Sequence, residues 1–254
     1  MSPLVLLVIL IIIALIFNFL NGFHDSANVV ATIISSRAMS GRSALILAAV
    51  ANLVGPFLFG VAVANTIGHD VAVPESITIS VVLASLLSAS IWNIVTWYYG
   101  IPASSSHGLI GGIIGAVIAG SGYKALIMTG FWKIIIALFI SPIIGFTIGW
   151  LVMKVTLRIL KKASPKANTA LKYAQIPSAI ALALSHGTND AQKTMGVIVM
   201  GLIVLGFQTT FYIPTWVIII NSITIGLGTA MGGWRIIQTL GGKFYRIRPI
   251  HSFS

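Results

Sequence analysis

Long apolar stretches separated by short polar interruptions dominate the chain. A helix needs about 20 apolar residues to cross the hydrocarbon core of a membrane. Four segments have this length and are predicted to be membrane-crossing helices: 43–67, 77–99, 131–153 and 214–232.

Other apolar segments are too short to cross a membrane alone: 26–36, 107–120, 176–184 and 191–206. They lie beside three polar interruptions, Asn21-Gly22, Gly100-Ile101-Pro102 and Ser185-His186-Gly187. Non-helical backbone at membrane depth is tolerated only where protein buries it or where it lines a wet cavity. We therefore expect three broken helices around one polar site.

Composition agrees with a membrane protein. Only 7% of the 254 residues are charged and 57% are hydrophobic, whereas about 25% of a soluble domain is charged. This composition excludes a soluble enzyme, a nucleic-acid-binding protein and a secreted disulfide scaffold as the main interpretation. The predicted fold class is an all-α polytopic membrane protein surrounded by lipid, and a homodimer is left open as its assembly. The apolar stretch 4–20 lacks a basic leader and a cleavage site, so we expect it in the mature protein.

Charge predicts the orientation. Six of the fifteen basic residues lie in the loop 154–172, which the positive-inside rule places in the cytoplasm. Arg37 and Arg42 place their loop on the same side. The loop 68–76 contains Asp70 and Glu75 without lysine or arginine, so we expect it on the outer side.

A short repeat relates the two halves of the chain. Residues 22–27 align with residues 187–192, which lie 165 positions later, and the charge argument gives the two copies opposite directions. Opposed copies with broken helices are typical of an inverted-repeat secondary transporter. We predict a first repeat at 1–153 with a re-entrant hairpin near 98–120, a cytoplasmic loop at 154–172, and a second repeat at 173–254.

Two of the four acidic residues, Asp25 and Asp190, lie in the repeated stretches. A carboxylate inside a membrane is costly, which favours a functional role over helix capping alone. Asn28 follows Asp25 by three residues, and Lys193 follows Asp190 by three, so each pair shares a helical face. Lys193 is either an ion-pair partner or a ligand contact, and the sequence leaves both open.

The third interruption leads into an apolar helix through Ser104, Ser105 and Ser106. Hydroxyls and free N–H groups at a helix N-terminus suit a small tetrahedral oxyanion. His24, His107 and His186 lack metal-ligand spacing, so we expect no metal site. Each histidine could bind an anion, titrate or satisfy a backbone group, and we favour the last. A membrane-embedded hydrolase that uses a serine near His107 is an alternative of another class, although no G-x-S-x-G motif is present. A purely structural membrane subunit is a third.

Three motifs in this order resemble the inorganic phosphate transporter (PiT) family, in its bacterial low-affinity branch. They are the first motif, residues 21–28, the serine motif, 101–107, and the second motif, 185–193. The resemblance implies a symporter, not an enzyme, that carries phosphate with protons or sodium across the inner membrane of a bacterium. It implies no cofactor, and sulfate is the alternative substrate.

The resemblance also indicates site residues. It implies substrate binding by Asp25, Asn28, Ser104, Ser105, Ser106 and Asp190, and we expect Asn189 and Lys193 of the second motif to take part as well. We expect the coupling ion at Asp25, Asn28, Asp190 and Glu75. In the family a second glutamate and a second hairpin would follow Ser254, so we expect the second repeat to be incomplete in this sequence.

Overall fold

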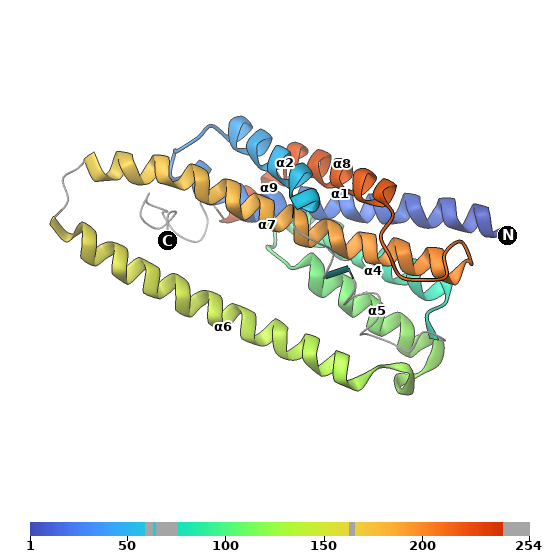
Figure 1. The fold of residues 1–254 in the computed structure, drawn as a ribbon. Coiled ribbons are helices and arrows are strands. Elements are labelled where there is room, and N and C mark those ends of the chain that lie inside the picture. Colours follow the sequence, from blue (N-terminus) through green and yellow to red (C-terminus); the bar gives the residue numbers. More distant parts are fainter. Residues whose placement is uncertain (59–62, 65–75, 163–165, 241–254) are drawn as a thin grey trace.

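The computed structural model describes residues 1–58, 63–64, 76–162 and 166–240, and its regular elements in these ranges are helices. The α-helices are α1 (Pro3–Ser35), α2 (Gly41–Leu58), α4 (Ile79–Tyr99), α5 (Ser105–Ser121), α6 (Met128–Ile159), α7 (Lys166–Val204), α8 (Thr215–Met231) and the short α9 (Trp234–Gln238) (Figure 1). Short 3-10 turns lie at Tyr123–Ala125 and Leu160–Lys162. Within the described ranges, α1, α2, α4 and α6 are long and apolar enough to cross a membrane, and α5 and α8 are shorter apolar helices. The all-α polytopic fold class is confirmed.

Two of the three predicted helix breaks are wrong. Helix α1 continues through Asn21-Gly22, and α7 continues through Ser185-His186-Gly187. Neither motif contains a proline, and a glycine costs a helix only about 1 kcal/mol relative to alanine. The short apolar segments on either side of each motif therefore form one continuous helix.

Gly22 and Gly187 instead allow close helix crossings. A Cβ atom on Gly22 would lie 2.4 Å from the carbonyl oxygen of Ile225 in α8. A Cβ atom on Gly187 would lie 2.4 Å from Cα of Asn52 in α2. Helix α1 packs most extensively on α8, and α2 packs most extensively on α7. The two repeated stretches thus place their glycines at corresponding crossings.

The third break is present and forms a hairpin. Helix α4 ends at Gly100, whose φ of 66° lies in the left-handed region that favours glycine. Ser104 then caps α5 by accepting a hydrogen bond from the His107 amide. The two helices pack closely, because Gly112 lies against the backbone of Ser85 and Gly108 against the ring of Trp92. The start of α4 and the end of α5 lie toward the same end of the molecule as the N-terminus (Figure 1).

Helices α1 and α7 run in opposite directions (Figure 1). Figure 1 shows that the α1–α2 connection, the end of α6 and the start of α7 lie at one end of the molecule, and that the chain after α7 reverses at the other. Arg37, Arg42 and the basic end of α6 therefore share one end, in agreement with the charge argument. The inverted repeat itself stays a prediction.

Candidate functional site

The three motifs meet at one cavity of about 370 Å³ between α1, α7 and the start of α5. Its lining residues are Asp25, Asn28, Pro102, Ala103, Ser104, Ser106, His186, Asn189, Asp190 and Lys193. The cavity thus brings together every predicted substrate-binding residue except Ser105, which lies behind it in contact with Asp25. Glu75, predicted to bind the coupling ion, lies outside the described residues.

The Asp25 carboxyl group contacts three side chains: a hydroxyl, an amide and an imidazole. The Ser105 hydroxyl donates to Oδ2 over 2.6 Å, and the Asn28 amide donates to Oδ1 over 3.2 Å. Nδ1 of His24 lies 3.3 Å from Oδ1. Ser105 also contacts the Asn21 side chain, but its one proton serves one acceptor at a time. Ser105 therefore links the Asp25 carboxyl group and the Asn21 side chain within α1.

Asp190 is held chiefly by a cation. Nζ of Lys193 lies 2.5 Å from Oδ1 of Asp190 and 2.5 Å from the Ser106 hydroxyl. Nδ1 of His186 lies 3.7 Å from Oδ2. From the sequence, Lys193 could be either an ion-pair partner or a ligand contact. The structure shows the ion pair and also places Lys193 on the cavity wall.

Two histidines make contacts that the sequence analysis missed. Nε2 of His24 lies 3.1 Å from the hydroxyl of Thr96 in α4, and His186 lines the cavity beside Asp190. The expectation of backbone partners is wrong for both, because their partners are side chains. The sequence contained a signal for His186, which precedes Asp190 by four residues and so lies on the same helical face.

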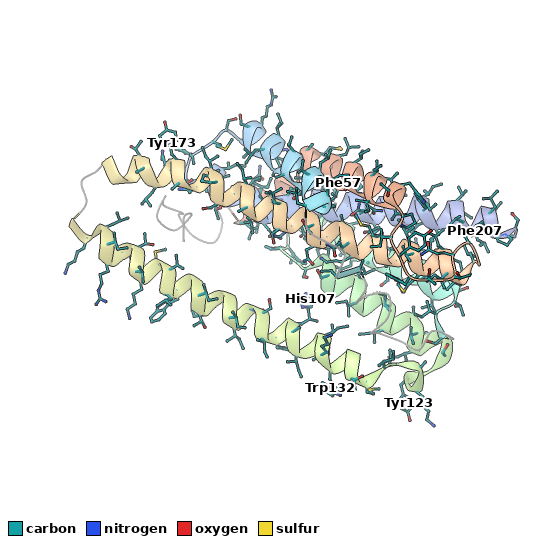
Figure 2. All side chains as sticks on the ribbon, in the orientation of Figure 1. Phe57, His107, Tyr123, Trp132, Tyr173 and Phe207 are labelled. Carbon is teal, nitrogen blue, oxygen red and sulfur yellow. The ribbon has the colours of Figure 1, made fainter. Side chains whose placement is uncertain are left out.

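A second cavity of about 430 Å³ adjoins the first and shares Ser104, Ser106, Asn189 and Lys193 with it. Its other walls are largely apolar side chains of α5 and α6. His107 lines this second cavity, at the start of α5 (Figure 2). Asp25 and Asp190 line the first cavity and not the second, so a process that needs both carboxylates takes place in the first cavity.

The start of α5 adds backbone donors to this site. The first N–H groups of a helix have no partner within the helix, and Ser105 and Ser106 occupy these positions. Hydroxyls, amides and the Lys193 ammonium together suit an oxyanion. The two carboxylates repel it, so the arrangement can bind an anion when a cation accompanies it.

Known proteins share this chain's sequence and fold. Residues 21–254 match the Phosphate transporter family. A "Probable low-affinity inorganic phosphate transporter" of Bacillus subtilis (strain 168) is 48% identical over 99% of this chain and 76% of its own length. A protein of the same name from Rhizobium meliloti (strain 1021) is 42% identical, over 98% and 75%. A solved structure titled "The sodium-dependent phosphate transporter" has a TM-score of 0.86 at 21% identity, over 98% of this chain and 81% of that one, which shows the fold. The motifs, the cavity that they line and these matches agree that the chain belongs to the phosphate transporter family.

Proposed function

We propose that this chain carries inorganic phosphate across the cytoplasmic membrane of a bacterium by symport with a proton or a sodium ion. Membership of the phosphate transporter family and the apolar helices support a multi-pass transporter rather than an enzyme. The observation that carries the proposal is the cavity in which hydroxyls, amides and one ammonium lie beside two carboxylates.

Phosphate binds, in this proposal, at the start of α5. Ser104 and Ser106 provide hydroxyls, Asn189 provides an amide, and Lys193 provides a positive charge, all on the wall of one cavity. These groups converge from two elements, α5 and α7. Such donors recognise a tetrahedral oxyanion without requiring a metal.

The coupling cation compensates for charge. Asp25 and Asp190 carry two negative charges when ionised, and Lys193 offsets one of them. A divalent phosphate therefore meets a site with a net negative charge. A proton on a carboxylate, or sodium held by carboxylate and amide oxygens, removes this repulsion, so the anion binds well only together with its cation.

Uptake of labelled phosphate into proteoliposomes tests the proposal. We expect accumulation under an imposed proton or sodium gradient, with the active gradient identifying the cation, and weak inhibition by excess sulfate. An Asp25→Asn variant in parallel vesicles serves as the control and should not accumulate phosphate. Uptake that is independent of both gradients would contradict symport. Equal uptake of sulfate would contradict the assignment of phosphate as the substrate.

Assembly as a homodimer stays a prediction. Chemical cross-linking of the chain in native membranes would test it. A discrete dimer band independent of expression level would support it, and a monomer alone would reject it.

A further inference from the structure

The two halves of the site are built alike but carry different charges. Asp25 in α1 and Asp190 in α7 occupy matching positions of the two repeated stretches. Three residues further along, Asn28 donates a neutral amide to Asp25, and Lys193 brings an ammonium group to Asp190. The same geometric place is therefore filled by a neutral donor in one half and by a fixed cation in the other.

Two consecutive serines at the start of α5 contact one half each. Ser105 donates to Asp25, and Ser106 accepts from Lys193. The hairpin thus touches both halves at once. The contacts that differ in charge are Asn28 to Asp25 and Lys193 to Asp190, since the hydroxyls are the same.

The negative charge of Asp190 is neutralised by a lysine, whereas that of Asp25 is not. Asp190 and Lys193 are each only 5% exposed and form a neutral pair. Each carboxylate has a histidine neighbour, His24 for Asp25 and His186 for Asp190. Asp25 is 8% exposed, and among the residues that the structure describes no lysine or arginine forms an ion pair with it. A buried charge without compensation is costly. The half that requires a mobile cation is therefore the one built around Asp25.

We propose that Lys193 is a tethered cation that occupies, in the second half of the site, the place of a mobile coupling ion. This inference rests on the proposed function and deepens it: Lys193 sets the number of cations that travel with each phosphate. The wild-type chain takes its mobile cation at Asp25 only. A lysine that served solely as a phosphate ligand would affect phosphate affinity without changing this number.

The matched variant is Lys193→Asn, which gives the second half the same Asp-x-x-Asn arrangement as the first. The measurement is the number of cations per phosphate, obtained from the membrane voltage at which phosphate flux reverses in proteoliposomes. We expect Lys193→Asn to carry one cation more than the wild type and to depend more steeply on cation concentration. Lys193→Arg, which retains the charge, should keep the wild-type number. An unchanged number in Lys193→Asn with only weaker phosphate affinity would overturn the inference.

If Lys193→Asn does not transport phosphate, the inference is tested by measuring phosphate binding to the purified, folded variant. For Lys193→Asn we expect little binding at low cation concentration and recovery as sodium is raised or the pH is lowered. Failure to bind phosphate across the full range of sodium and pH would reject the tethered-cation role. Wild-type vesicles in the same series separate the two proposals, since absence of driven uptake there would reject the proposed function itself.

Discussion

The hydroxyl of Ser105 lies 2.6 Å from Oδ2 of Asp25, which joins the start of α5 directly to α1. Ser105 is 1% exposed, so this hydrogen bond lies inside the protein. The contact therefore holds the tip of the hairpin against the carboxylate that we place at the centre of cation coupling.

Removal of this hydroxyl should impair coupled transport. A hydrogen bond to a charged group contributes about 1.5–3 kcal/mol, and 1.4 kcal/mol corresponds to roughly tenfold. We expect Ser105→Ala to lower the kcat/KM of phosphate uptake about 10- to 100-fold, and Ser105→Thr to retain more activity. Ser178→Ala is the matched control, because the Ser178 hydroxyl is exposed and donates to the Ala174 carbonyl oxygen of the same helix. Equal uptake by Ser105→Ala and the wild type would contradict a role for this contact.

Asp190 should matter for stability as well as for transport. Loss of one partner of a buried ion pair costs about 3–5 kcal/mol, whereas replacement of both partners is often nearly neutral. We therefore expect Asp190→Asn to lower the Tm of the purified protein, because it leaves the Lys193 ammonium unpaired. The double variant Asp190→Asn with Lys193→Met should recover most of the Tm.

Uptake provides the second readout for these variants. Neither the single variant nor the double variant should accumulate phosphate, because both lack the carboxylate. Recovery of stability without recovery of transport would separate the two roles of Asp190. A Tm that stays low in the double variant would show that the ion pair does not account for the loss.

The link between His24 and Thr96 predicts that α4 positions the Asp25 half of the site. Thr96→Val keeps the side-chain shape but removes the hydroxyl that lies 3.1 Å from the His24 ring. We expect a stability loss of about 1–3 kcal/mol, the cost of leaving a buried polar group without a partner. Uptake should fall, and Thr96→Ser should preserve both properties. Thermal unfolding and uptake of the three proteins measure this, and wild-type behaviour of Thr96→Val would contradict it.

The sequence predicts where the chemistry lies better than it predicts the course of the helices. Asp25, Asp190 and the serines meet as expected, because each lies in a polar motif that only a site inside the protein can accommodate. Whether Gly22 and Gly187 break a helix or allow a crossing depends on Ile225 and Asn52, which lie far away in the chain. The local pattern does not contain this information, and the same holds for the distant partner of His24.

The helix crossings predict strong position dependence for glycine substitution. Gly187→Ala would place a methyl group 2.4 Å from Cα of Asn52, in contact with rigid backbone. We expect a marked loss of Tm, because overpacking typically costs about 1–3 kcal/mol and occasionally more. Gly145→Ala in α6 is the matched control, since no described atom lies within 4 Å of its added Cβ, and alanine favours the helix. Equal Tm values for the two variants would contradict the crossing.

The predicted inverted repeat requires that corresponding loops lie on opposite sides of the membrane. The chain contains no cysteine, so single cysteines can report location without background. Ser40 follows α1 and Thr209 follows α7, and both are exposed. In intact cells we expect a membrane-impermeant thiol reagent to label Thr209→Cys but not Ser40→Cys, and to label both after the membrane is permeabilised. Lys161→Cys, at the basic end of α6, should behave like Ser40→Cys, because both lie at the same end of the molecule (Figure 1) and the positive-inside rule predicts that this end is cytoplasmic. Labelling of Ser40→Cys and Thr209→Cys from the same side would exclude opposite orientations of α1 and α7, and with them the inverted repeat on which the equivalence of Asn28 and Lys193 depends.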